Sequence, residues 1–145
     1  MENLERLVER KRLNRHQPTR REIENHLSTA QAFRGAANLR GTPERVRFHN
    51  LYDAAHAVAL AGLKLAGYRA PDGEGNRQVT LSCVEQTLSI RRGSAAAFTE
   101  ANRLRSLMQY QGEDVDIPDS LVETLIAALE EGLREVEIRL KRLGP

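Results

Sequence analysis

Residues 42–69, TPERVRFHNLYDAAHAVALAGLKLAGYR, decide the fold because they read as one long and mostly apolar helix. Within residues 54–66 six residues are alanine, and only His56, Gly62 and Lys64 are not apolar. A helix that is apolar on nearly every side belongs at the centre of a bundle. Its small side chains also let neighbouring helices approach closely. The sequence therefore predicts an all-α protein built around this segment.

The ends of this helix carry recognisable signals. Thr42 is a residue type that caps helix N-termini, and Pro43 suits the first helical turn. Gly67 is typical of the position just after a helix. We therefore expect the helix to begin near Thr42 and to end at Gly67.

The rest of the chain predicts an up-and-down helical bundle of five to six helices and no strand. Further helices are expected over residues 2–13, 19–39, 76–88, 94–110 and from 120 to the end. Thr19 with Glu22, and Ser120 with Glu123, have the spacing of a capping box. In the last helix apolar residues recur every seven positions, which is typical of packing against antiparallel helices. They are Val122, Leu129, Val136 and Leu143, and in the second series Ile126, Leu133 and Leu140.

Length and composition indicate one domain over residues 1–145, with a short basic helix and a break over 1–17 and the bundle over 18–145. No apolar run is long enough to span a membrane, and the charged start does not resemble a signal peptide. The single cysteine, Cys83, excludes an internal disulfide and fits a core position. We expect a cytoplasmic protein that does not bind membranes.

The net charge of +2 is unevenly distributed. Residues 6–21 hold seven basic residues against one acid, whereas residues 113–137 are rich in acids. A basic segment of this kind can bind nucleic acid. The alternative is a solvated face, or a basic segment that lies on the acidic final helix or on a partner subunit.

His49, Asp53 and His56 share one helical face, a spacing that can hold a metal ion between two imidazoles and a carboxylate. The alternative, which we favour, is a polar stripe facing solvent or a partner. We predict no metal and no cofactor. The glycines at 73 and 75 lack the lysine and hydroxyl residue of a phosphate-binding loop, so they predict a turn.

Arginines on the helix over 94–110 suggest a second kind of chemistry. Metal-independent RNA cleavage needs a general acid or base near a 2′-hydroxyl and a cation that stabilises the phosphate. Arg103 and Arg105 lie one to two turns before Tyr110, and the three side chains can line a cleft. The alternative is that the arginines are surface charges and that Tyr110 packs at the helix end.

The order of segments resembles bacterial proteins of the HEPN class (higher-eukaryote and prokaryote nucleotide-binding domain) over nearly the whole chain. The segments are RLVERKRLNRHQPTRREIENHL, RFHNLYDAAHAVALAGLKLAGYR, a Gly-rich turn before RQVTLSCVEQTL, a helix with RLRSLMQYQG, and a long final helix. The resemblance implies a helical bundle that usually forms a homodimer. Many members are toxins or defence proteins that cut RNA, and a small nucleotidyltransferase often neutralises them.

In the resemblance, Arg105 occupies the place of the catalytic arginine and Ser106 that of the polar residue after it. The family's histidine is absent, and Tyr110 stands at the fifth position after the arginine. A tyrosine with a pKa of about 10 is a poor general base at neutral pH. The literal arginine–histidine spacings at Arg21 and His26 lie where the family has no site. So do those at Arg10 with His16 and Arg20 with His26, and we interpret all three as chance.

The first hypothesis is a divergent RNA- or nucleotide-binding component of a toxin–antitoxin or defence module. It assigns no catalytic activity, because Tyr110 stands in place of the family's histidine. Its site residues would be Arg103, Arg105, Ser106 and Tyr110, with added phosphate contacts from Arg10, Arg12 and Arg15. The second is an active metal-independent endoribonuclease toxin. It would use Arg105 with Tyr110, or with a histidine from elsewhere such as His26 or His49. The third is a non-catalytic adaptor that binds a protein partner. The expected partners are RNA, a nucleotidyltransferase antitoxin and a second copy of the chain.

Overall fold

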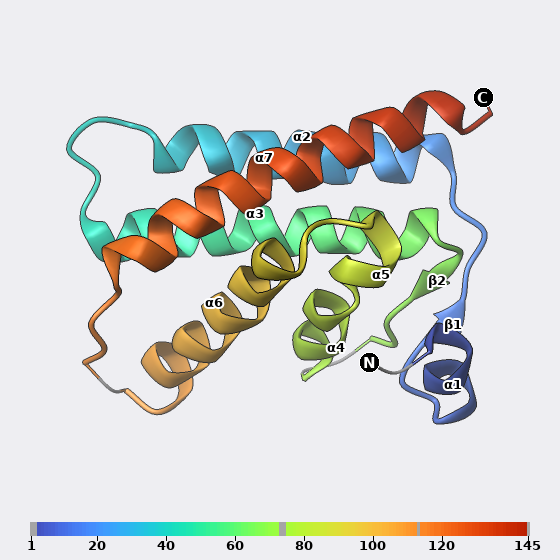
Figure 1. Ribbon diagram of the computed structural model, residues 1–145, viewed down its shortest axis with the longest axis horizontal. Helices are drawn as coiled ribbons and strands as arrows, with labels where there is room; N and C mark the ends of the chain where they lie inside the picture. The colour runs from blue at the N-terminus through green and yellow to red at the C-terminus, as the bar shows by residue number, and fades with distance from the viewer. Residues whose placement is uncertain (1–2, 73–74, 113, 145) are drawn as a thin grey trace.

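The computed structural model describes residues 3–72, 75–112 and 114–144, and the side chain of Tyr110 lies outside this description. The fold is an all-α helical bundle, as predicted (Figure 1). Its elements in chain order are α1 (Leu4–Glu9), β1 (Asn14–Arg15), α2 (Arg20–Ala37), α3 (Glu44–Leu65), β2 (Tyr68–Arg69), α4 (Asn76–Ser82), α5 (Val84–Leu88), α6 (Arg92–Tyr110) and α7 (Asp119–Arg142).

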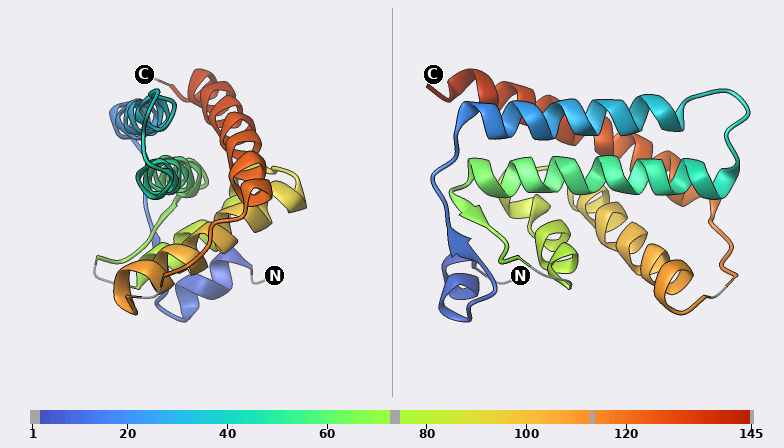
Figure 2. Two further views of the ribbon diagram at one scale, coloured as in Figure 1. Left: turned by 90° about the vertical axis from the view of Figure 1, so that its left-hand side faces the viewer. Right: turned by 180° about the vertical axis from the view of Figure 1, so that it is seen from behind.

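Helix α3 lies at the centre of the bundle. It packs along α2 in an antiparallel pair, α7 crosses both, and α4, α5 and α6 cover the opposite side of α3 (Figures 1 and 2). The alanine-rich half of α3 is buried almost throughout, which confirms the prediction made from its composition. Its buried residues are Phe48, Leu51, Tyr52, Ala54, Ala55, Ala57, Val58, Ala59, Ala61, Gly62 and Leu63.

Two glycines allow helices to come closer than any side chain would permit. A Cβ atom on Gly132 of α7 would lie 2.7 Å from Cγ1 of Val58, and one on Gly62 of α3 would lie 2.8 Å from Cγ of Leu88. Both distances are shorter than carbon atoms tolerate without movement. The close contacts of α3 with α7 and with α5 therefore depend on these glycines.

The helix ends confirm some predicted caps and correct others. The capping box of Thr19 and Glu22 is present at the start of α2, and Gly67 follows α3 with a φ of 97°. The cap predicted at Thr42 is wrong, because its hydroxyl donates to the carbonyl of Leu39 and Pro43 takes the N-cap position. The box predicted at Ser120 is also wrong, since α7 already begins at residue 119.

The expected helix over residues 76–88 is divided at Cys83 into α4 and α5. The hydroxyls of Thr80 and Ser82 donate to the carbonyls of Asn76 and Val79. Such bonds compete with helical geometry and bend helices, so α5 can turn toward α7.

The prediction of no strand is corrected at the break before α2. Residues 14 and 15 pair with Arg69 and Tyr68 in a short antiparallel ribbon, because the chain approaching Pro18 is extended and its backbone groups need partners.

The ribbon ties α1 to the bundle, and α1 completes a second, smaller apolar cluster. Its buried members are Leu7, Leu13, Leu63, Val79 and Cys83. Cys83 is 1% exposed, which confirms its predicted core position. Within the described residues, none of the helices combines the length and apolarity that a membrane crossing requires.

Candidate functional site

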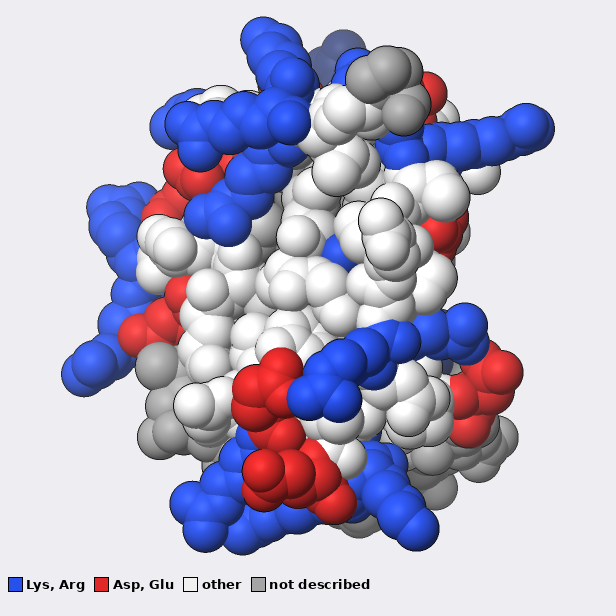
Figure 3. Space-filling view, turned by 90° about the vertical axis from the view of Figure 1, so that its right-hand side faces the viewer, with Lys and Arg blue, Asp and Glu red and all other residues white. Residues whose placement is uncertain are grey.

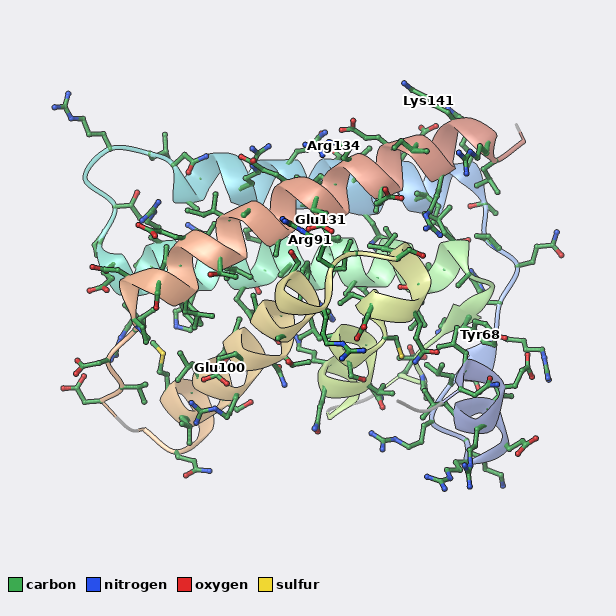
Figure 4. The ribbon with its side chains drawn as sticks, viewed as in Figure 1. Tyr68, Arg91, Glu100, Glu131, Arg134 and Lys141 are labelled. Carbon is green, nitrogen blue, oxygen red and sulfur yellow. The ribbon has the colours of Figure 1, made fainter. Side chains whose placement is uncertain are left out.

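Glu131 of α7 fixes the first turn of α6, the helix that carries the predicted site. Its carboxylate accepts hydrogen bonds of 2.7 Å from the backbone N–H of Arg91 and from the hydroxyl of Ser94. Figure 4 labels Arg91 and Glu131, which meet where α6 begins beside α7. Partial burial would raise the pKa of Glu131, but the hydrogen bonds from Arg91 and Ser94 hold it below its ordinary value. The negative charge of Glu131 is also stabilised there, because the N-terminus of α6 is the positive end of its helix dipole.

A buried tyrosine of α3 lies under two arginines from different helices. The guanidinium carbon of Arg105 of α6 is 5.0 Å from the centre of the Tyr52 ring, and that of Arg77 of α4 is 5.7 Å from it. The Tyr52 hydroxyl donates a 2.8 Å hydrogen bond to Oδ1 of Asn102, and Nη1 of Arg77 lies 3.6 Å from Oδ1 of Asp53. Both distances to the ring are within the range of cation–π attraction.

Two histidines of α3 adjoin this group. Burial lowers the pKa of His56 to about 4, and the guanidinium groups of Arg77 and Arg105 act in the same direction. Burial also lowers the pKa of His49, an effect that Asp53 opposes and Arg105 reinforces. Both imidazoles are therefore neutral at pH 7 and able to accept a proton. We call the whole group the Tyr52 cluster: His49, Tyr52, Asp53, His56, Arg77, Asn102 and Arg105.

The structure separates the predicted α6 residues onto two sides of that helix. Arg105 faces α3 within the Tyr52 cluster, whereas Arg103 and Ser106 line a groove of about 520 Å³ between α4 and α6. Arg103 is paired with Glu100, which is labelled in Figure 4, through Nη2 at 2.6 Å. Tyr110 ends α6, and its side chain lies outside the described residues.

The predicted basic residues of the N-terminal segment lie on the surface near α1. Arg10, Arg12 and Arg15 are exposed, and Arg15 forms an ion pair with Glu5. On the face of the molecule drawn in Figure 3, basic side chains gather at the end that holds α1, together with acidic ones. Arg12 also lines a smaller groove against α4. The structure therefore brings Arg12 to α4. Arg20, near the other end of the basic segment, donates to the backbone carbonyls of Leu140 and Leu143 at the end of α7.

His26, the histidine of two literal motif matches, belongs to a different polar group. Burial lowers its pKa to about 4, and Lys64 acts in the same direction while Glu22 opposes it. His16, the histidine of the remaining match, contacts Glu22 through Nε2 at 2.7 Å. Both histidines therefore lie at the junction of α2 with the end of α3.

His49, Asp53 and His56, the residues of the predicted polar stripe, are each partly exposed. Among the described residues, no three histidine, cysteine or acidic side chains are grouped so that they could hold a metal ion. Asp53 instead faces Arg77.

Arg77, Asn102 and Tyr52 are the residues of the cluster that sequence reasoning missed. The sequence pattern predicts Tyr52 only as part of an apolar core helix, and the residue is fully buried. The sequence feature that could have indicated this site is a charged residue, Arg77, in the first turn of an amphipathic helix directly after the Gly-rich turn. That signal is too common to identify a site.

Chemically, the cluster offers two partly exposed cations beside neutral proton acceptors. Arginine presents a planar set of donors that matches phosphate oxygens. The arrangement can therefore bind a phosphate group and place an imidazole near it.

No protein-family model matches this chain, and searches of curated proteins and of solved structures likewise find no match.

Proposed function

We propose that this chain is a HEPN-like RNA- or nucleotide-binding protein, whose phosphate site is the Tyr52 cluster. The observation that carries the proposal is the convergence of Arg77 and Arg105, from two helices, on the ring of Tyr52. Two cations held near one rigid aromatic ring are suited to a phosphodiester.

The wider setting of the proposal follows the family resemblance. We propose a toxin–antitoxin or defence module, with a second copy of this chain and a nucleotidyltransferase as partners. A helical bundle by itself does not distinguish this family from others. The RNA experiment below therefore tests the site and not the family.

The test is RNA binding by fluorescence anisotropy across a series of salt concentrations. A single-stranded RNA should bind the wild type with a salt slope near −0.7 for each phosphate contact, and Arg105→Ala should reduce the slope by about one contact and weaken binding about tenfold. Arg134→Ala, at an exposed arginine of α7 that is labelled in Figure 4 and is not part of the cluster, is the matched control and should change neither quantity.

Equal weakening by the Arg105 and Arg134 variants would mean that RNA senses only the overall charge of the protein. Binding that does not depend on salt, or no binding at all, would also contradict the proposal.

The neutral histidines support a second candidate function, a metal-independent endoribonuclease. His49 and His56 both lie close enough to Arg105 for its charge to lower their pKa values, so a base and a phosphate-binding cation are neighbours. Mixed cellular RNA incubated in the presence of a chelator should then be cut by the wild type and not by Arg105→Ala or His49→Ala. RNA that stays intact with the wild type would reject this second function and leave the binding function in place.

A further inference from the structure

The groove between α4 and α6 differs in character from the Tyr52 cluster. Leu81 and Leu107 lie among its lining residues, and most of the others are uncharged polar side chains. Those polar residues are Gln78, Ser82, Thr99, Asn102, Ser106 and Gln111. A groove with apolar contacts and neutral donors and acceptors fits a planar heterocycle better than it fits a phosphate.

Two charged residues, Glu100 and Arg103, are found among the described residues that line this groove, and they neutralise each other. Nε and Nη2 of Arg103 both donate to the carboxylate of Glu100, at distances of 2.6 to 3.2 Å. The paired hydrogen bonds fix the plane of the guanidinium group, whose side chain remains 60% exposed. A flat, oriented guanidinium group is a surface on which an unpaired base can stack.

The groove also adjoins the proposed phosphate site. Asn102 lines the groove, and its Oδ1 accepts the hydrogen bond from Tyr52, which leaves the amide N–H groups to serve as donors. On the other side, Gln78 and Ser82 line both this groove and the smaller one that contains Arg12. An RNA strand that passes over α4 would thus meet Arg12 at one end of its path, the arginines of the Tyr52 cluster at the other end, and neutral polar groups between them.

We infer that the α4–α6 groove is a subsite for an unpaired nucleobase of a single-stranded RNA whose phosphate lies at the Tyr52 cluster. This inference rests on the proposed function. Gln78 and Ser106 hydrogen-bond the edge of the base, and Arg103 stacks on its face. Because a paired base presents neither a free face nor its pairing edge, the groove excludes duplex RNA.

The experiment compares a single-stranded RNA with an abasic strand of the same length, which keeps the phosphates and lacks the bases. The wild type should bind the RNA about tenfold more tightly than the abasic strand, as expected for one stacked base. The double variant Gln78→Ala with Ser106→Ala should lose most of that ratio. The matched control, Gln31→Ala with Ser28→Ala on exposed positions of α2, should keep it.

The variants separate the two proposals. Arg105→Ala should weaken both strands equally and leave the ratio unchanged. If the wild type binds both strands equally while Arg105→Ala still weakens both, the base subsite is wrong and the phosphate site stands. A ratio that survives the groove variant places base recognition elsewhere and overturns the subsite, and no binding of either strand overturns both proposals. Thermal unfolding followed by circular dichroism verifies that each variant is folded.

Discussion

At the scale of single residues, neighbouring glutamates of α7 have unequal roles. Glu131 accepts three hydrogen bonds at the start of α6, two from Arg91 and one from Ser94, whereas Glu130 forms an exposed ion pair with Arg34 at 3.0 Å. We expect Glu131→Gln to lower the free energy of unfolding by about 1–3 kcal/mol, since an amide cannot replace all of these charge-assisted bonds. Glu130→Gln should cost less than about 1 kcal/mol. Urea unfolding of both variants measures the difference, and equal losses would contradict this role of Glu131.

At the scale of helices, the closest packing of the bundle depends on Gly132. We expect Gly132→Ala to destabilise the protein by about 1–3 kcal/mol, because the new methyl group would collide with Val58 and the helices must separate. Gly35→Ala on α2 is the matched control, because a Cβ atom there meets nothing within 4 Å. It should stabilise the protein by up to about 1 kcal/mol through helix propensity. Thermal unfolding measures the stability of both variants. If Gly132→Ala left the stability unchanged, α3 and α7 would be able to move apart at little cost in free energy.

The elements that the sequence predicted well are those governed by local chemistry. The alanines of α3 and the Thr19–Glu22 box act within one helix, so a pattern of a few residues contains the information. The division at Cys83 depends on where α5 must reach, and the short ribbon depends on a partner strand far along the chain. Local patterns cannot supply either.

At the scale of the whole molecule, buried imidazoles make stability depend on pH. The pKa values of His26 and His56 fall from 6.5 in the unfolded chain to about 4 in the fold. Unfolding therefore takes up protons between these values, so stability is complete above pH 6.5 and is lost as the pH falls toward 4. Because both rings are partly exposed, we expect a loss of about 1–2 kcal/mol for each.

Urea unfolding at pH about 7 and about 5 measures this loss. The double variant His26→Gln with His56→Gln should show a smaller difference between the two conditions. Glu22 does not affect this comparison. Its pKa falls from 4.5 in the unfolded chain to about 2 in the fold, so the stability that its carboxylate contributes is lost only below pH 4.5. An unchanged difference in the double variant would assign the acid sensitivity to other groups.

The candidate site could be predicted only in part, for a reason that also belongs to this scale. Arg105 was singled out by a resemblance and by its helix, and it does face the Tyr52 cluster. Its companions come from α3 and α4, and the hydrogen bond between Tyr52 and Asn102 joins residues 50 positions apart. Such convergence is a property of the folded chain, which no spacing within one helix reveals.

The position of Cys83 beneath α1 turns the chain's only thiol into a built-in chemical reporter. A thiol reagent can reach it only when α1 lifts away, so the labelling rate measures how often this corner opens while the bundle stays folded. We expect Leu7→Ala to accelerate labelling more than tenfold, because it removes a buried contact worth about 2–5 kcal/mol. Leu39→Ala, at a side chain 67% exposed, should leave the rate unchanged. The labelling rate of Cys83, measured with and without RNA, would report whether a ligand on the neighbouring face of α4 reduces this local opening.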